Sequence, residues 1–420
     1  MTVQRLSGPG SFAFPTTGDS SLSFSEAMVS AAIHDVVRTR APFAGASSAE
    51  GAGACFEAVE QAVSALGRDA GLVLIFPTGL SDPRDALAQA HAAAGEVQVA
   101  GMTGTGAIAA GGAIANGCSA LAFAASVPVG VGVGGSGAPR AAGRAAAEGA
   151  LARVEPRSGH TVLLLFVDSE SGDQAEIVAG AYEVAGAQIP LAGGAAGGIT
   201  RAQFADGRAM AKSVVAVAIV AGAPVGVGVA HGCVPRGTPS IVTRASGQTV
   251  LQLDGRPAET VYLEKLGEDA HLSDADFEAV AMVHPLAEPT LSGDVHLRYV
   301  RTRAPGGGLV CATSIEPNAA VDICDHVPEA IVTSARAAVD DAIEPLPRAA
   351  EAALLFDCAA RSARFGNPLA ARELESITSA FGAHPPCLAG VYTRGEIGRA
   401  RGAKGDRNYA VVVVAFGSEA

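Results

Sequence analysis

Residues 162–166 read Val-Leu-Leu-Leu-Phe, and similar apolar runs occur as LVLIF at Leu72–Phe76 and as AALLF at Ala352–Phe356. Each run is short, rich in aliphatic side chains and ends on phenylalanine, a pattern that is typical of a buried strand. An alanine-rich stretch with helical periodicity precedes each run: Ala54–Leu66, Ala141–Leu151 and Ala330–Ile343. The recurrence predicts one supersecondary unit used three times.

A glycine-punctuated turn follows each run after a second predicted helix. The three turns are VAGMTGTGAI from Val99, LAGGAAGGIT from Leu191 and LAGVYTRGEI from Leu388. A further apolar run closes each unit, at Phe123, Val220 and Phe416. The expected unit is therefore helix–strand–helix–turn–strand. In three equivalent units, the central residues Leu74, Leu164 and Leu354 occupy matching buried strand positions.

This pattern predicts an α/β (mixed α+β) fold in which mixed sheets are covered by helices. Residues 1–40 are expected to form an N-terminal segment with a helix over Phe24–Arg40. Residues 41–235 should form a first domain of two units. Residues 236–420 should form a second domain, with an antiparallel insert ahead of the third unit.

The sequence PVGVGV appears twice, at Pro128–Val133 and Pro224–Val229, and closes the first two units in this interpretation. Alternating glycines leave one face of such a strand without side chains. We expect another element to pack closely there.

Composition excludes several classes of protein. The net charge of −13 disfavours nucleic acid and anionic membranes as partners, because both require clustered Lys and Arg. Seven cysteines without a CxxC spacing argue against a disulfide framework or a structural zinc site, and no signal peptide is apparent. A reducing cytoplasm is the expected location.

The third turn carries the polar side chains, whereas its two sisters carry mostly Gly and Ala. In an extended turn, Tyr392, Arg394 and Glu396 point to the same side. Arg394 would pair with a ligand carboxylate, Glu396 would accept an ammonium group and Tyr392 would supply an apolar wall, with Thr393 beside them. The alternative is a solvated loop with a Glu–Arg pair.

Two further candidates follow the third unit's first strand. Cys358 is either a nucleophile at a strand end or a small core residue. Arg361 is a possible second cation for a ligand. The histidines show no metal-binding spacing, although one of them could ligate haem. The glycine-rich turns lead into strands and so do not match a dinucleotide-binding loop.

The chain resembles the FIST family, with a FIST N and a FIST C domain. The C-terminal resemblance rests on VHPLAE at Val283–Glu288, LLFDCAAR at Leu354–Arg361 and LAGVYTRGEIG at Leu388–Gly398. The N-terminal resemblance includes LVLIFPTGLSD at Leu72–Asp82 and PLAGGAAGG at Pro190–Gly198. One departure is in the first turn, Gly101–Ile108, where the Cys and Glu usual in the family are missing. The resemblance therefore places the functional weight on the third turn.

The resemblance implies a bacterial sensory protein of a signal-transduction system that binds an amino acid or a related metabolite. The length of the chain suggests a stand-alone sensor that acts on a signalling partner protein. No cofactor is expected. The alternatives left open are a haem-based nitric oxide sensor, an enzyme acting on a small polar substrate, and a scaffold that binds another protein.

Overall fold

The computed structural model describes residues 39–40, 44–79, 82–135, 137–268, 271–289, 295–363, 367–399 and 405–417. The predicted helix over Phe24–Arg40 lies outside this part of the chain, except for its last two residues. Those two residues form a short strand, β1 (Thr39–Arg40), which pairs with the next strand. The end of that predicted helix is therefore wrong.

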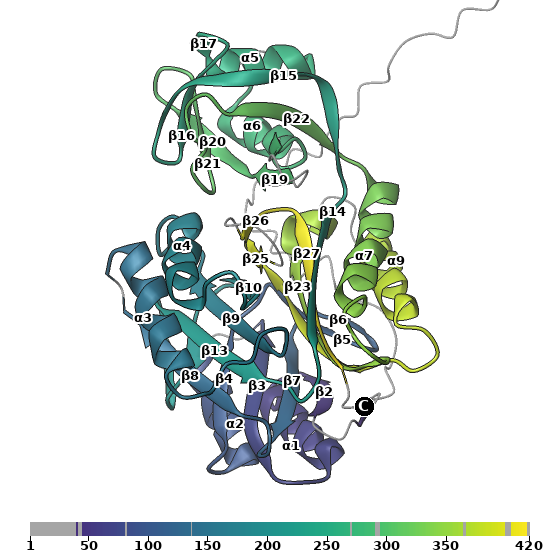
Figure 1. The fold of residues 1–420 in the computed structure, drawn as a ribbon. Helices are drawn as coiled ribbons and strands as arrows, with labels where there is room; N and C mark the ends of the chain where they lie inside the picture. Colours follow the sequence, from purple (N-terminus) through teal and green to yellow (C-terminus); the bar gives the residue numbers. More distant parts are fainter. Residues whose placement is uncertain are drawn as a thin grey trace, which may run out of the picture.

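Three units of the same order build the larger part of the molecule (Figure 1). The first unit consists of β2 (Ala44–Glu50), α1 (Ala54–Leu66), β3 (Ala70–Thr78), α2 (Pro83–Ala94), β4 (Gln98–Met102), β5 (Gly106–Ala109), β6 (Gly112–Ile114) and β7 (Gly117–Ala124). The second consists of β8 (Val129–Gly134), α3 (Pro139–Leu151), β9 (Thr161–Asp168), α4 (Gln174–Ala185), β10 (Leu191–Ala196), β11 (Gln203–Ala205), β12 (Arg208–Met210) and β13 (Val214–Val220).

The third unit repeats this order but contains a long insertion after its first strand. It consists of β14 (Val225–His231), α7 (Pro328–Ile343), β23 (Ala350–Cys358), α8 (Ala359–Ala363), α9 (Asn367–Ala380), β24 (Cys387–Thr393), β25 (Glu396–Arg399), β26 (Asp406–Arg407) and β27 (Ala410–Gly417). The predicted mixed α/β class and the threefold repeat are confirmed. The unit boundaries are displaced by one strand, because each VGVGV strand opens the following unit instead of closing the previous one.

The units exchange hairpins around a ring. The β5–β6 hairpin of the first unit pairs with β24 of the third unit, and β11 of the second unit pairs with β4 of the first. The β25–β26 hairpin of the third unit pairs with β10 of the second. Each sheet is therefore completed by a neighbouring unit, and we call the three units together the body.

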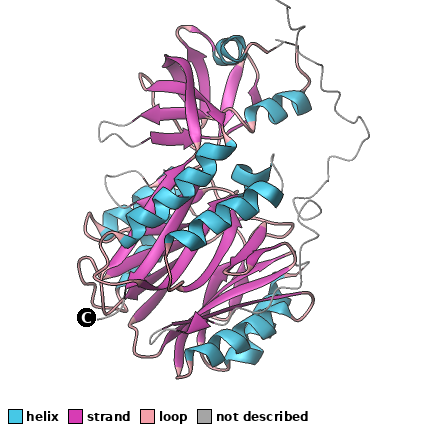
Figure 2. Cartoon of the chain, turned by 90° about the vertical axis from the view of Figure 1, so that its right-hand side faces the viewer, coloured by secondary structure: helices cyan, strands magenta, loops and turns pink. Residues whose placement is uncertain are grey.

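Strand periodicity decides where the core lies. Alternate side chains of each central strand face one shared apolar core, and the others face the helices that cover the sheets. Figure 2 shows these helices lying against the sheets. Leu74, Leu164 and Leu354 are all fully buried in the shared core, at matching registers opposite Ala100, Ala192 and Ala389. The predicted equivalence of the three leucines is confirmed.

Phenylalanines from the three central strands meet in the shared core. The ring centroid of Phe76 lies 5.9 Å from that of Phe166 and 6.0 Å from that of Phe356. The centroids of Phe166 and Phe356 are 6.2 Å apart. Three rings from equivalent strand ends in mutual contact mark the pseudo-threefold axis of the body.

The glycine-alternating strands allow the helices to pack closely. A Cβ atom added at Gly130 or Gly132 would overlap a carbonyl oxygen of α3, and one at Gly226 or Gly228 would overlap a carbonyl oxygen of α7. The predicted close approach is confirmed at these positions.

The insertion forms a separate lobe, drawn above the body in Figure 1. It consists of β15 (Cys233–Ser246), β16 (Thr249–Leu253), β17 (Arg256–Pro257), α5 (Ala258–Leu266), α6 (Asp274–Ala281), β18 (Leu286–Pro289), β19 (Val295–Arg298), β20 (Val300–Ala304), β21 (Gly308–Cys311) and β22 (Ala320–His326). Its strands are antiparallel, and α5 and α6 pack on them through a second apolar core.

The alternating run VAMVHPL at Val280–Leu286 reads as a strand in the sequence, but its start belongs to a helix. Ser273 caps α6 by accepting a hydrogen bond from the backbone N–H of Asp276, and Phe277 and Ala281, one turn apart, face the lobe's core. The strand begins only at Leu286. A short run of apolar residues fits the periodicity of a helix and that of a strand equally well, so the sequence does not distinguish the two here.

Candidate functional site

The three glycine-punctuated turns meet in a ring of backbone hydrogen bonds. Thr105 N–H donates to the carbonyl of Tyr392, Arg394 N–H donates to that of Ala195, and Gly197 N–H donates to that of Thr103, at 3.0–3.1 Å. These donors and acceptors occupy equivalent positions in the three turns. The backbone of the third turn is therefore fixed by its two sisters.

The third turn does not place its side chains on one side. Gly395 has φ of 131°, where the chain leaves the third sheet and enters the second, so the strand alternation is interrupted. Tyr392 is buried beneath the helices of the third unit, Glu396 is fully buried elsewhere, and Arg394 is exposed. The expectation of a common side for these three residues is wrong.

Glu396 lies in a closed set of uncharged donors. One carboxyl oxygen accepts from the N–H of Ala410 at 3.2 Å, and the Cys358 thiol also bonds to this side chain. Thr393 Oγ1 lies 2.7 Å from the other oxygen and 3.2 Å from the carbonyl oxygen of Asp357. A hydroxyl has a single proton, so both Thr393 contacts are satisfied only when the Glu396 carboxyl is protonated.

Burial raises the pKa of Glu396 to about 7, against the smaller opposing effect of these hydrogen bonds. Glu396 has no ion pair to a cation in the described ranges. Its carboxyl group therefore titrates near neutral pH inside the protein.

Cys358 shares this interior. Burial, followed by the nearby Glu396 carboxyl, raises the pKa of the thiol well above its ordinary value. The thiol is therefore protonated at neutral pH, which deprives it of the reactivity of a thiolate.

Arg361 is surrounded by protein groups. Its guanidinium group donates to Glu373 at 2.9 Å, lies 3.1 Å from Asp357 and also bonds to the backbone carbonyls of Tyr409 and Ile331. Burial is the main cause that raises the pKa of Asp357 and that of Glu373. A ligand would have to displace these partners to reach Arg361.

Arg394 differs from the other candidates because its side chain reaches solvent. Its guanidinium group makes no ion pair or hydrogen bond with any part of the chain that is described. The adjacent Gly395 lies against Asn408, whose side-chain oxygen accepts the N–H of Tyr299 from the lobe at 3.0 Å. Arg394 therefore stands where the body meets the lobe.

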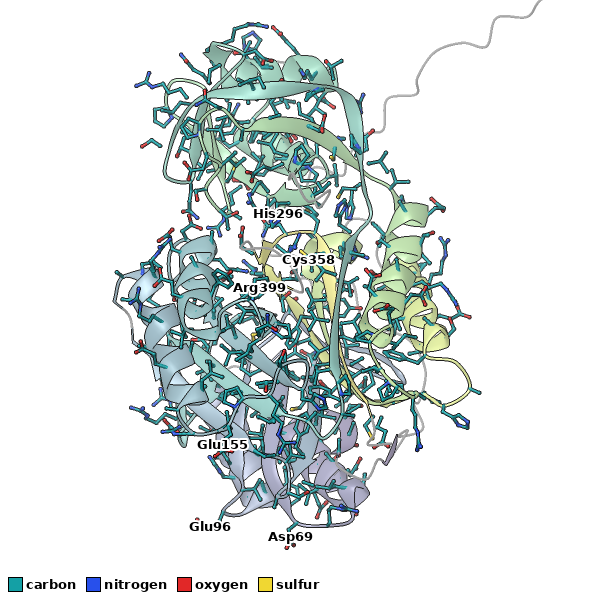
Figure 3. All side chains as sticks on the ribbon, viewed as in Figure 1. Asp69, Glu96, Glu155, His296, Cys358 and Arg399 are labelled. Atoms are coloured by element: carbon teal, nitrogen blue, oxygen red, sulfur yellow. The ribbon has the colours of Figure 1, made fainter. Side chains whose placement is uncertain are left out.

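Further contacts fasten the lobe at this point. The rings of Tyr299 and Tyr409 lie 5.9 Å apart, and the Tyr409 hydroxyl donates to the Met282 carbonyl at 3.0 Å. In addition, Arg298 of the lobe pairs with Asp406 of the body at 2.8 Å. Figure 3 places Cys358 and His296 in the same region, between lobe and body. The sequence offered no signal for Tyr299, Asn408 or Tyr409, because contacts between distant segments decide their roles.

The histidines of the middle of the chain gather in the lobe and at its junction. His326 stacks edge-on against Tyr409 with centroids 5.6 Å apart, His296 is buried in β19, and His284 lies 3.1 Å from Asp325. Within the described ranges, no group of three His, Cys, Asp or Glu side chains is placed to hold a metal ion. No helix there is both long and apolar enough to cross a bilayer.

Comparison with known families identifies both parts of the chain. Residues 71–256 match the FIST N domain and residues 258–399 match the FIST C domain. The chain belongs to the FIST family. FIST domains are associated with sensing in signal transduction.

Curated relatives come from mycobacteria. An uncharacterized protein of Mycobacterium bovis (Mb0898c) and one of Mycobacterium tuberculosis (MT0897) are each 32% identical over 226 residues, covering 50% of this chain and 54% of the relative. A second M. tuberculosis protein, MT0656, is 30% identical over 219 residues, covering 50% and 55%. The chain spans about half the length of the curated relatives it matches.

Proposed function

We propose that this FIST protein is a cytoplasmic sensor that binds a small ligand, an amino acid or a related metabolite, where the third turn meets the inserted lobe. Binding shifts the lobe relative to the body, and a partner protein responds to that shift. The observation that carries the proposal is the exposed guanidinium group of Arg394 at this junction. The cytoplasmic location is supported by seven buried cysteines that all remain free thiols.

Arg394 has the properties expected of a ligand contact. Its backbone is held by the ring of turns, so little backbone order is lost when the side chain binds. Its planar, permanently charged group makes two parallel hydrogen bonds to a carboxylate. Of the six residues singled out in the sequence, it is the one with an exposed charged group.

The buried candidate residues support the conformation of the third turn. Thr393 and Glu396 of the turn form one buried contact group with Cys358. Arg361 pairs with Asp357 and Glu373 in the same interior. In this proposal these residues fix the turn's conformation, whereas Arg394 touches the ligand. In this proposal, of the six residues singled out in the sequence, Arg394 contacts the ligand and the other five support the turn.

A ligand at this junction would act on the position of the lobe. Two chain crossings connect lobe and body, between β14 and β15 and between β22 and α7. A ligand that contacts both parts binds one lobe position more tightly than others, and this difference is what shifts the equilibrium.

The test is a thermal-shift screen of the full chain against amino acids and small carboxylic acids, followed by titration calorimetry. A ligand at one hundred times its Kd should stabilise the native state by about 2.7 kcal/mol. Arg394→Gln should weaken binding about ten- to a hundredfold. Arg348→Gln is the matched control, because Arg348 is exposed between α7 and β23, outside the junction. Unchanged affinity in Arg394→Gln would refute the proposed site.

A further inference from the structure

The second unit contains a cavity of about 170 Å³ where β8 and β9 end and the helices α3 and α4 begin. β8 and β9 both run antiparallel to β13, so their carboxyl ends lie at the same edge of the sheet, which is where α/β sheets bind ligands. The floor of the cavity is apolar and buried, formed by Ala142, Ile177 and Val214. Its rim is polar, formed by Glu170, Ser171 and Lys212.

Two polar groups of this rim have no bonding partner within the described ranges. The Ser171 hydroxyl oxygen is buried and makes no hydrogen bond there, an arrangement that costs free energy unless a ligand or water supplies the bond. The Lys212 side chain likewise makes no ion pair or hydrogen bond with the described residues. Its backbone N–H donates to Asp168 at 2.9 Å, which fixes its position at the rim. Glu170 is paired with Arg201 at 2.7 Å and therefore does not neutralise the ammonium group.

In the sister units, the protein itself engages the residue that corresponds to Lys212. Counting three positions back from the strand residues that lie opposite the three core phenylalanines gives the equivalent set Asn116, Lys212 and Tyr409. The Asn116 amide lies against Gly79, where an added Cβ atom would overlap it. Tyr409 packs against Tyr299 and His326 of the lobe, which is inserted at the corresponding connection of the third unit. In the second unit this place is the cavity.

The lining combines a cation and a free hydroxyl with an apolar floor, and an aliphatic carboxylate has the complementary pattern. Carboxylate oxygens accept charge-assisted hydrogen bonds from ammonium and hydroxyl groups. The first turn of α3 borders the cavity at Pro139 and has no side-chain cap, so its dipole adds to the preference for an anion. The volume exceeds that needed for a single water and is below the range of about 300–1,000 Å³ typical of drug-sized ligands.

We propose that this cavity is a second ligand site, which binds a short-chain aliphatic carboxylate. Lys212 and Ser171 hold the carboxylate at the rim, and the hydrocarbon chain lies on the floor formed by Ala142, Ile177 and Val214. An inorganic phosphate ion offers the charge without a chain and leaves the floor uncovered. The site goes beyond the proposed function, because it shares no residue with the contact at Arg394.

The experiment is titration calorimetry of the full chain with butyrate, acetate, butyramide and inorganic phosphate at constant ionic strength. Butyrate should bind about tenfold more tightly than acetate, because its two further methylene groups cover the floor. Butyramide, which lacks the charge, should bind about ten- to a hundredfold more weakly than butyrate. Phosphate should also bind more weakly than butyrate.

Variants locate the binding. Lys212→Gln and Ser171→Ala should each weaken butyrate binding about ten- to a hundredfold. Both should melt at the wild-type temperature without ligand, because neither side chain bonds to the described part of the protein. Arg348→Gln, which removes an exposed cation between α7 and β23, and Arg394→Gln should bind butyrate as the wild type does.

The outcomes are distinct from those for Arg394. The inference is wrong if butyrate does not bind, if acetate or phosphate binds as tightly, or if Lys212→Gln and Ser171→Ala keep the wild-type affinity. Loss of butyrate binding in Arg394→Gln alone would place the carboxylate at the junction with the lobe; it would support the proposed function and overturn the second site. Binding that requires Lys212 and Ser171 but not Arg394 establishes the cavity as a site of its own.

Discussion

At the scale of single residues, Glu396 separates the third turn from its sisters. The equivalent positions hold Ala107 and Ile199, so the ring of turns forms without a carboxyl group there. The third unit therefore buries an ionisable group at a position where its sister units carry aliphatic side chains. The consequence is a measurable dependence of stability on pH.

Because of Glu396, the free energy of unfolding should fall as the pH rises. Its native pKa of about 7 exceeds the ordinary value of 4.5, so the native state binds this proton more tightly than the unfolded chain. The contribution is complete below about pH 4.5 and is lost as the pH rises to 7, a change of roughly 3 kcal/mol. Urea unfolding of wild type and Glu396→Gln between pH 5 and 8 measures it. Glu375→Gln, which changes an exposed carboxylate, is the control and should show the same pH dependence of stability as wild type. If Glu396→Gln also kept the wild-type pH dependence, the raised pKa of Glu396 would be contradicted.

Arg361 shows where reasoning from sequence stops at this scale. A cation after a strand end was a reasonable ligand contact. The carboxylate that engages it, Glu373, lies on the following helix, and no local pattern reveals that the two side chains meet. Arg394 drew attention because its own turn differs from two sister turns in the same chain, and its contact with a ligand stays a prediction.

At the scale of elements, the glycines of β8 and β14 set the distance between strand and helix. Because the carbonyl oxygen of Ala338 in α7 occupies the space of a side chain at Gly228, the helix packs directly against the strand backbone. The sequence predicted this close contact from the alternation alone. It did not indicate the sheet to which each of these strands belongs. The same apolar alternation would fit pairing with the preceding unit or with the following unit.

Gly228→Val should overpack this contact and reduce the free energy of unfolding by about 1–3 kcal/mol or more. The matched control is Gly135→Val, since a Cβ atom at Gly135 meets nothing within 4 Å. Thermal and urea unfolding of both variants make the comparison. Equal stability of the two variants would show that α7 can move away from β14 without cost.

At the scale of the whole molecule, the shared core binds the three units into one body. The sequence predicted the three units from their repeated runs, and each run did become a central strand. It did not predict the exchange of hairpins, because pairing between distant strands leaves no trace in local periodicity. It also placed the insert correctly as antiparallel without showing that it interrupts the third unit after β14.

The three phenylalanines on the axis should be energetically equivalent and coupled. Replacing Phe76, Phe166 or Phe356 with Ala should cost about 3–5 kcal/mol in each case, because each ring fills the same kind of position. Since the rings touch, the cost of a double replacement should differ from the sum of two single ones by about 0.5–3 kcal/mol. A set of urea unfolding curves tests both statements. If the three single variants lost unequal stability, or if the double variants lost the exact sum of the single losses, the three rings would not act as one packing unit.

The exchanged hairpins also determine when the protein can finish folding during its synthesis. Thr105 bonds to the carbonyl oxygen of Tyr392, 287 positions further along the chain. The β5–β6 hairpin leaves the ribosome early but finds its partner strand only when almost the entire chain has been made. Until then the first unit carries an unfinished strand pairing, and such edges invite pairing with other chains. The ring thus makes the newborn chain dependent on its own C-terminal unit, and truncated products should be removed or aggregate instead of accumulating as folded fragments.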